Sequence, residues 1–254
     1  MKTKIYIKLT YLSKNNKKEI DSIFSSYEFN GIIYGSEFCD NYTFQLEEFD
    51  RKKELFYNTP IFITSRNSDQ IYQNIVLLNQ ISKKFRVIIH DFGLLQELKL
   101  KGMIDLVILG RFFFNRQFSF NKHLLNMLIG EGIKSIEIDA KNFGKIRVIK
   151  QNNFETFYQL FHSKIVTFAR SCYLRTITGK DCTPKSRLCE KMNEIKLKNP
   201  YICLDVGGHH LFLGFNQNFN KFLEYQQYCD NVILEFPKKR ADIDQFLKIL
   251  NILQ

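Results

Sequence analysis

Three cysteines lie close together in this sequence, and a fourth lies far upstream. The three are Cys172, Cys182 and Cys189, in FARSCYLRTITGKDCTPKSRLCEK, and the fourth is Cys39, in IIYGSEFCDNY. The first segment is polar and contains glycine and proline, which makes it a poor place to bury cysteine as a small apolar side chain. Four thiolates from two distant segments are soft ligands that suit an iron–sulfur cluster or Zn²⁺. The pattern therefore predicts a metal centre.

The intervals between these cysteines favour a cluster but leave zinc open. Nine residues separate Cys172 from Cys182, and six separate Cys182 from Cys189, whereas structural zinc sites usually pair cysteines two to four residues apart. Longer intervals fit a cluster more easily, because its iron atoms are themselves separated. Five basic residues interleave with the cysteines: Arg170, Arg175, Lys180, Lys185 and Arg187. Such cations would stabilise a negatively charged cluster, although a solvated loop can contain the same residues.

The two remaining cysteines have a different setting. Cys203 lies in the apolar run YICLDV, and Cys229 lies beside NVILEF. Because free cysteine is among the most buried residue types, we expect both to be structural rather than ligands.

Polar residues that follow predicted strands are weaker site candidates. His90 and Asp91 close one such strand, and Arg111 follows another in VILGRFFFN. Arg111 could bind an anionic group of a substrate, or it could form a salt bridge that holds its loop. Both interpretations of Arg111 stay open.

The other histidines are not expected to chelate a metal. His209 and His210 are adjacent in GGHHLFLGF, and adjacent residues of a strand point to opposite faces. His162, in FHSKIV, is expected to be a buried histidine with satisfied hydrogen bonds. The sequence contains no motif of a serine hydrolase, a zinc protease, a phosphate-binding loop or a dinucleotide-binding fold.

Short β-rich runs alternate with helical periodicity along the chain. The predicted strands span Lys4–Leu12, Gly31–Tyr34, Pro60–Thr64, Arg86–His90, Asp105–Leu109, Ser135–Ile138, Lys164–Phe168, Tyr201–Leu204 and Asn231–Glu235. The predicted helices span Lys17–Phe29, Phe44–Tyr57, Asp69–Lys84, Gly93–Lys101, Asn121–Gly130, Asn153–Phe161, Asn218–Tyr228 and Ala241–Leu253. This alternation predicts an α/β fold with a parallel sheet, most simply a (β/α) TIM-barrel-like fold that is regular, irregular or incomplete. An open doubly wound sheet is the alternative.

No linker divides the chain, so we expect a single barrel-like domain over residues 1–254, with a Cys-rich loop at residues 169–190. In such a fold Cys39 follows the strand that ends near Tyr34, and Cys172 follows the strand that ends near Phe168. The carboxyl ends of barrel strands share one face, which is the face that carries active sites. Two cysteines from distant segments are therefore predicted to meet there.

Composition limits the compartment and the partners. Apolar residues make up 44 % of the 254 residues, and no run of 18 or more apolar residues is available to cross a membrane. The start, MKTKIYIKLT, lacks the apolar segment of a signal peptide. We therefore expect a cytoplasmic protein, in which clustered cysteines indicate metal or catalysis rather than disulfides. The net charge of +11 would suit nucleic acid, but the basic residues are dispersed, so nucleic acid is a less favoured partner.

Taken in order along the chain, several segments resemble the collagenase-like peptidase family, and most closely its UbiV-like branch. IIYGSEFC is similar to a family strand followed by a glycine, a glutamate and a ligand cysteine, here Cys39. IIHDFGLLQEL, VILGRFFFN and LLNMLIGEGIKSIEID resemble the units that follow. FHSKIVTFARSC, GKDC and RLC place Cys172, Cys182 and Cys189 at the later ligand positions, and DVGGHHLFLGF resembles the strand and turn beyond them.

The resemblance implies a [4Fe–4S] cluster on a barrel-like scaffold, with Cys39, Cys172, Cys182 and Cys189 as its ligands. It also implies a heterodimer with a homologous UbiU-like subunit. Together the two subunits would hydroxylate the ubiquinone ring, in anaerobic ubiquinone biosynthesis, with an oxygen donor other than O₂. The resemblance does not imply proteolytic activity, and it does not specify catalytic residues.

Two other functions stay open at this point. A related enzyme of the same family would hydroxylate tRNA or rRNA bases, which the positive charge would suit. A structural interaction module that carries zinc or a cluster, without catalysis of its own, is the other.

Two apolar runs bear on the expected partner. Phe112-Phe113-Phe114 and Leu211-Phe212-Leu213 are longer than a solvated surface usually tolerates. Burial in the core is the simpler explanation for each run. Docking of the UbiU-like partner near the cluster is the alternative.

Overall fold

Eight parallel strands close into a barrel. The structure is a computed structural model that describes residues 3–9, 17–36, 53–61, 63, 68–114, 122–139, 143–168, 179–180, 196–198, 203–206, 210–217, 219–237 and 240–254. Around the ring the strands are β11 (Asn231–Glu235), β1 (Lys4–Leu9), β2 (Gly31–Tyr34), β3 (Glu54–Asn58), β4 (Phe85–Ile89), β5 (Val107–Leu109), β6 (Ser135–Ile138) and β7 (Glu155–Phe168), and β7 pairs back with β11. Every neighbouring pair in this ring is parallel. The predicted TIM-barrel-like α/β fold is confirmed.

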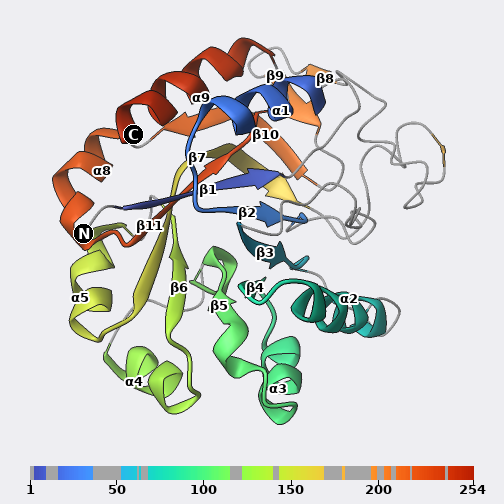
Figure 1. The fold of residues 1–254 in the computed structure, drawn as a ribbon, viewed down its shortest axis with the longest axis vertical. Coiled ribbons are helices and arrows are strands. Elements are labelled where there is room, and N and C mark those ends of the chain that lie inside the picture. The colour runs from blue at the N-terminus through green and yellow to red at the C-terminus, as the bar shows by residue number, and fades with distance from the viewer. Residues whose placement is uncertain are drawn as a thin grey trace.

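Helices cover the outside of the barrel (Figure 1). They are α1 (Lys17–Ser26), α2 (Ser68–Ile81), α3 (Phe92–Leu100), α4 (Lys122–Gly130), α5 (Ile146–Gln151), α8 (Phe219–Tyr225) and α9 (Arg240–Leu253). Short 3₁₀ turns accompany them: η2 (Ile104–Leu106), η3 (Arg111–Phe114), η4 (Phe143–Lys145) and η5 (Gln226–Tyr228). Each of α1 to α5 lies between two consecutive strands, and α8 and α9 flank β11 along the chain, as a (β/α) barrel requires.

Local sequence explains why these helices form and which face they bury. In α2 the side chains of Ile71, Ile75 and Leu78 are buried, because residues spaced by three and four lie on one helix face. Helix α3 begins where Asp91 caps it, since the Asp91 side chain accepts a hydrogen bond of 2.9 Å from the backbone N–H of Leu94. Asp91 therefore has a structural role, and the expectation that it belongs to a site is not supported.

An apolar layer fills the middle of the barrel. Successive side chains of a strand point alternately toward the helices and toward the barrel axis. The inward side chains of this layer are Tyr6, Ile33, Phe56, Ile88, Ile108, Phe157 and Ile233, and all of them are fully buried. Three of its seven side chains are aromatic, with ring centroids 4.8 Å apart for Tyr6 and Phe56 and 5.5 Å apart for Phe56 and Phe157. The barrel is therefore a packed core rather than a pore.

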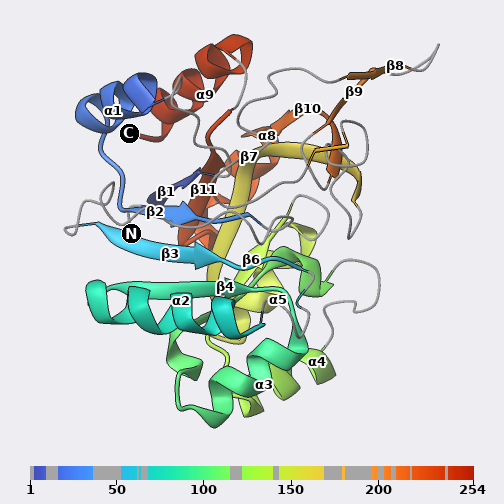
Figure 2. The same cartoon turned by 90° about the vertical axis from the view of Figure 1, so that its right-hand side faces the viewer.

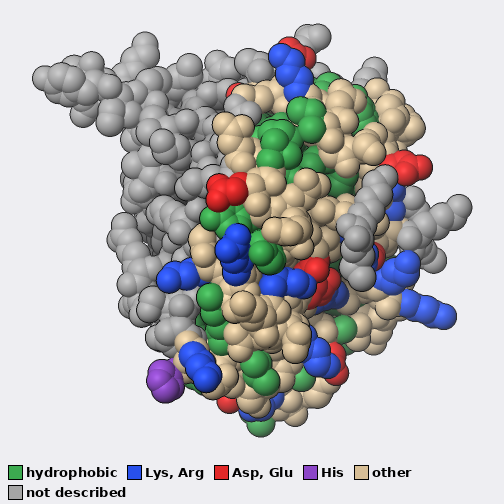
Figure 3. All heavy atoms as spheres, turned by 90° about the vertical axis from the view of Figure 1, so that its left-hand side faces the viewer, with side chains coloured by type: hydrophobic (Ala, Val, Ile, Leu, Met, Phe, Trp, Pro, Cys, Tyr) green, Lys and Arg blue, Asp and Glu red, His purple; other side chains and the backbone are tan. Residues whose placement is uncertain are grey.

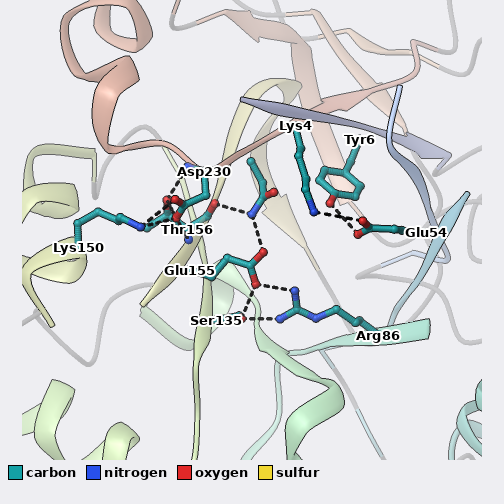
Figure 4. Close-up of polar contacts among 10 residues, drawn as sticks. Lys4, Tyr6, Glu54, Arg86, Ser135, Lys150, Glu155, Thr156 and Asp230 are labelled. Carbon is teal, nitrogen blue, oxygen red and sulfur yellow. Dashed lines mark hydrogen bonds and ion pairs between the residues drawn. The ribbon is translucent and has the colours of Figure 1, made fainter. Parts of the chain in front are cut away.

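Charged side chains close the amino-terminal end of the barrel below this layer (Figure 4). Arg86 donates to Glu155 Oε2 at 2.6 Å and also bonds Ser135, whose hydroxyl donates to the same carboxylate oxygen at 2.8 Å. Asn231 donates to the other oxygen, Glu155 Oε1, at 3.0 Å. The Arg86 guanidinium also lies 5.2 Å from the centroid of the Phe157 ring, so it joins the ion pair to the apolar layer.

This network should make the stability of the protein sensitive to acid. Burial alone would raise the pKa of Glu155, but the Arg86 charge and hydrogen bonds from Arg86, Ser135 and Asn231 lower it below its usual value. A carboxyl group with a depressed folded-state pKa stabilises the fold above its unfolded pKa, and this contribution is lost as the pH falls through the folded pKa. We expect Glu155→Gln to lose less stability than the wild type as the pH falls below 4.5, the ordinary pKa of a glutamate.

Urea unfolding at pH 7 and at pH 3 to 4 measures this difference. The difference between the two proteins in the stability lost on acidification should not exceed about 1 kcal/mol, because the Glu155 side chain is 36 % exposed and solvent screens its ion pair with Arg86. Asp105→Asn is the control, since it removes a carboxylate from a well-exposed ion pair with Lys134. A Glu155→Gln variant with the wild-type acid profile would contradict the expectation.

Three antiparallel strands extend the sheet beyond the barrel. They are β10 (His210–Gln217), which pairs with β7, then β9 (Cys203–Val206) and β8 (Lys196–Lys198). In Figure 2 β8 and β9 project away from the barrel. The strand predicted at Tyr201–Leu204 thus exists as β9 with shifted bounds, but it lies outside the barrel.

Three sequence predictions of secondary structure are wrong. The helix predicted at Phe44–Tyr57 overlaps strand β3, and the helix predicted at Asn153–Phe161 is the start of strand β7. The strand predicted at Pro60–Thr64 is not one where that stretch is described, because β3 ends at Asn58. In β7 residues 156–161 are buried on both faces, so their apolar side chains do not alternate and instead imitate helical spacing.

Candidate functional site

A ring of buried polar side chains occupies the carboxyl end of the barrel, which we call the mouth. These residues are Lys8, Asn58, His90, Glu137, Gln159 and Glu235, and their exposed fractions lie between 0 and 9 %. Five of them stand two residues after an inward apolar side chain. Glu137 points inward as well, because its neighbours Ile136 and Ile138 belong to the outer core cluster. In barrels of this kind the carboxyl end carries the active site. Burying a polar group costs free energy unless it is hydrogen-bonded, so six such groups at this end indicate a site.

His90 is held in the mouth from three sides. Its Nε2 lies 3.0 Å from Asn58 Oδ1, and its ring meets the Phe112 ring edge-on with centroids 5.5 Å apart. On the third side a Cβ at Gly110 would lie 2.0 Å from His90 Cε1 and 2.1 Å from His90 Nδ1. Only glycine leaves room for the imidazole at this position. The prediction that His90 lies at the mouth is thus supported by its place in the structure.

Replacing Gly110 with alanine should expel the His90 ring. The added methyl group would occupy space filled by the imidazole, which would break the His90–Asn58 hydrogen bond. We expect a loss of about 1–3 kcal/mol in the free energy of unfolding, the usual cost of overpacking a core. Urea denaturation measures it.

Gly130→Ala is the matched control for this change. A Cβ at Gly130 would meet nothing within 4 Å, so we expect that variant to be neutral or slightly stabilised. Equal stabilities for the two variants would show that His90 is not confined as described.

Glu137 organises a second part of the mouth. Its Oε2 accepts a hydrogen bond of 2.9 Å from the backbone N–H of Arg111, and its Oε1 accepts one from Gln159 Nε2. Arg111 is 4 % exposed, and its guanidinium lies 4.8 Å from the Phe112 ring centroid. The sequence left open whether Arg111 binds an anion or holds its loop. Its backbone contact shows that it contributes to the architecture of the mouth.

Lys8 and Glu235 bring opposite charges to a third part of the mouth. The strand register pairs these two residues directly, on the neighbouring strands β1 and β11. Lys8 is 1 % exposed and Glu235 is 3 % exposed. Asp139, which is 7 % exposed, immediately follows β6. The mouth can therefore offer hydrogen-bond donors, acceptors and both signs of charge within one buried region.

The four predicted cluster ligands, Cys39, Cys172, Cys182 and Cys189, lie outside the described residues. The two strands that lead to them are described: β2 ends at Tyr34, and β7 ends at Phe168. Both run parallel in the same ring and point to the side of the barrel that carries the mouth, and β7 continues beyond the ring after Phe161, where it pairs with β10. Within the described residues, no group of three or more His, Cys, Asp or Glu side chains is placed to hold a metal.

Cys229 is not suited to replace one of these ligands. It precedes β11 and therefore lies at the amino-terminal end of the barrel, away from the mouth. It is 6 % exposed, and burial, together with the Asp230 charge, raises the pKa of its thiol to about 12. Because the thiolate is the form that binds metal, this residue is structural, as the sequence predicted.

The remaining candidates are not assembled into a site. His162 is buried on β7, which confirms the expected burial, whereas the expectation that its hydrogen bonds are satisfied is not confirmed. Backbone positions alone are described for Cys203, at the start of β9, and for His210, at the start of β10, and His209 lies outside the described residues. Phe113 is 6 % exposed within the main core cluster, so core burial explains this member of the first apolar run.

Sequence reasoning missed five members of the mouth. These are Lys8, Asn58, Glu137, Gln159 and Glu235. Four of them interrupt or end apolar strand sequences, as in KIYIKL, ELFYN, SIEI and NVILE. A polar residue near the carboxyl end of a predicted buried strand is thus the signal that could have found them. Gln159 was hidden because its strand was taken for a helix.

Two cavities formed by described residues lie at the other end of the barrel. The larger, of about 770 Å³, is lined by residues that include Thr3, Phe24 and Lys53. Inside it the Lys53 ammonium lies 3.5 Å from the Phe29 ring centroid. The polar ring of the mouth does not contribute to this cavity, so we do not assign it the function of the protein.

The described surface shows no concentration of positive charge on the face seen in Figure 3, where basic side chains are spread among acidic ones. Exposed ion pairs such as Lys134–Asp105 and Lys99–Glu131 account for part of this mixture. No described helix has both the length and the apolar character needed to cross a membrane. Comparison with protein-family models, curated proteins and solved structures found no match to this chain, so the site itself must carry the functional argument.

Proposed function

We propose that this chain is an iron–sulfur protein that holds its cluster beside the mouth of the barrel, with Cys39, Cys172, Cys182 and Cys189 as ligands. One observation carries the proposal: β2 and β7, the strands that precede Cys39 and Cys172, point to the same side of one closed parallel barrel. Two cysteines separated by more than half of the sequence can meet only if the fold returns to the same place. All-thiolate coordination is typical of such clusters.

Local backbone geometry after β2 supports this placement. Gly35 has a φ of +103°, a conformation that favours glycine, and a Cβ there would lie 2.5 Å from the backbone oxygen of Asn58. The chain therefore leaves β2 in close contact with the end of β3. The next residue, Ser36, is 2 % exposed, so the chain is still buried at the mouth where this described segment ends.

We further propose that the reaction is the hydroxylation implied by the sequence resemblance, performed with a homologous UbiU-like subunit. When bound, the cluster would supply electron-transfer chemistry. In the overall change a ring C–H becomes C–OH, the oxygen atom comes from a donor other than O₂, and that donor leaves reduced by two electrons. The buried donors and acceptors of the mouth, among them Asn58 and Gln159, suit the binding of an uncharged ring substrate.

Anaerobic purification tests the metal centre. Iron and sulfide should each approach four per chain in a brown protein, whereas stoichiometric zinc in a colourless protein would refute the proposal.

Size-exclusion chromatography after co-expression with a UbiU-like subunit tests the partner, and separate elution would exclude the complex. Quinone analysis of a deletion strain grown without oxygen tests the substrate, since an unchanged quinone content would exclude ubiquinone-ring hydroxylation.

A further inference from the structure

Two buried side-chain amides face each other across the mouth. Asn58 lies on β3 and Gln159 on β7, and three strands separate them in each direction around the ring. They therefore stand on opposite walls. Their exposed fractions are 1 % and 0 %, and each stands two residues beyond an aromatic side chain of the middle layer, Phe56 and Phe157 respectively.

Each amide is oriented by a bond at one of its two ends. His90 Nε2 lies 3.0 Å from Asn58 Oδ1, and an amide oxygen can only accept, so this contact turns Asn58 Nδ2 away from His90. On the other wall Gln159 Nε2 donates to Glu137 Oε1. A carboxylate can only accept, so the Gln159 carbonyl oxygen points away from Glu137. Gly110 and the Arg111 N–H, described above, position His90 and Glu137 in turn.

The opposite end of each amide has no hydrogen-bonding partner. Within the described part of the chain this holds for Asn58 Nδ2 and for Gln159 Oε1, both of which are buried. Buried polar atoms of native proteins are almost always paired, with protein or with a bound molecule. Each wall thus has one oriented group that a bound molecule would satisfy, a donor on Asn58 and an acceptor on Gln159.

The charges around the mouth indicate an uncharged occupant. Two basic side chains, Lys8 and Arg111, are balanced by two carboxyl groups, those of Glu137 and Glu235. An anion would meet these two carboxylates and also the Gln159 carbonyl oxygen. A cation would meet the N–H groups of Asn58. The apolar floor below includes the rings of Tyr6, Phe56 and Phe157, which suit a flat ring.

We infer that the mouth binds a neutral aromatic molecule that carries a carbonyl oxygen on one side and a hydroxyl group on the other. The carbonyl accepts from Asn58 Nδ2, and the hydroxyl donates to Gln159 Oε1. His90 and Glu137 are positioning residues for the two amides. The inference rests on the proposed function, because the bound ring would lie at the end of the barrel where we propose the cluster.

A series of small probes tests the inference on the anaerobically purified full-length protein. The probes are 4-hydroxyacetophenone, acetophenone without the hydroxyl, phenol without the carbonyl, and the 4-hydroxybenzoate anion. We expect 4-hydroxyacetophenone to shift the side-chain amide signals of Asn58 and Gln159 in NMR spectra and to bind at least tenfold more tightly than each of the other three. Equal affinities for the four probes would overturn the inference, and so would shifts confined to the amino-terminal cavity at Thr3, Phe24 and Lys53.

Two substitutions provide the second measurement. Asn58→Leu and Gln159→Met keep the approximate side-chain size but remove the amides, and each should weaken 4-hydroxyacetophenone binding at least tenfold. Gln80→Met, which changes an exposed residue of α2, should leave it unchanged. Wild-type affinity in folded Asn58→Leu or Gln159→Met would refute the assignment, and the probe series decides if a variant does not fold. Metal analysis is independent of both measurements, so a failed inference is distinguishable from a failed cluster proposal.

Discussion

Replacing any one of Cys39, Cys172, Cys182 and Cys189 with serine is expected to bleach the protein. A serine hydroxyl is a much poorer ligand for iron than a thiolate, so losing one of four ligands should abolish stable cluster binding rather than reduce it in proportion. The measurements are the visible absorption of the anaerobically purified variant and its iron and sulfide content. We expect less than about a tenth of the wild-type iron, in line with the all-cysteine ligation of such clusters.

Cys229→Ser is the matched control for this series. Cys229 is buried at the amino-terminal end of the barrel, and its raised thiol pKa keeps it protonated. Its replacement should preserve the colour and the iron content while lowering stability slightly, since a hydroxyl then occupies an apolar site. Bleaching by Cys229→Ser, or full iron content in Cys39→Ser, would show that the ligand set is wrong.

The barrel could be predicted because its signals are local and repeated. Strands such as Gly31–Tyr34, Ser135–Ile138 and Asn231–Glu235 are short apolar runs whose bounds the structure reproduces. Helices with one buried face, such as Ser68–Ile81, are predictable from their apolar spacing and from an acidic residue in the first turn. Right-handed βα repetition then leaves few topologies, so a moderate number of correct elements was enough to specify a closed ring.

The errors fall where a strand is buried on both faces or is rich in aromatic residues. In β7, Phe157, Tyr158, Leu160 and Phe161 are all fully buried, because one set packs against helices and the other fills the barrel. Such a strand loses its alternation, and its spacing becomes compatible with a helix. Tertiary packing decides the outcome, and packing is not available from one sequence.

The mouth was only partly predictable for a related reason. His90 and Arg111 were found because they follow strand ends in sequence. Asn58 and Gln159 were missed because the strands that carry them were misplaced. Their function in the mouth also depends on partners remote in sequence, since Asn58 and His90 are 32 positions apart and Glu137 and Gln159 are 22 positions apart. Such pairs become visible only when the ring closes.

The polar groups at the two ends of the barrel, above and below the apolar layer, differ in how completely they are hydrogen-bonded. At the amino-terminal end every oxygen of Glu155 is bonded, and Arg86 packs against the Phe157 ring. At the mouth, one polar atom of Asn58 and one of Gln159 have no partner among the described residues. A fully paired polar network adds to stability, whereas an unpaired buried group costs free energy until a bound molecule pairs with it. The apolar layer should therefore contribute to stability and also form the floor of the site.

Phe157→Ala is expected to be the most damaging substitution in the barrel interior. Phe157 is fully buried, its ring lies 5.5 Å from that of Phe56 and 5.6 Å from that of Tyr6, and it supports the Arg86 guanidinium. Removing the ring leaves a cavity at the centre of a closed ring that cannot collapse easily. We expect the free energy of unfolding to fall by about 3–5 kcal/mol, the usual range for a buried phenylalanine.

Urea or thermal unfolding of Phe157→Ala, Phe157→Leu and Leu100→Ala measures this effect. Phe157→Leu restores most of the volume and should cost no more than about 1.5 kcal/mol. Leu100 is 87 % exposed, so Leu100→Ala should stay within about 0.5 kcal/mol of the wild type. If Phe157→Ala were no less stable than Phe157→Leu, the apolar layer would not be the close-packed centre of the barrel. The mouth would then lack the rigid floor that holds Asn58 and Gln159 in register.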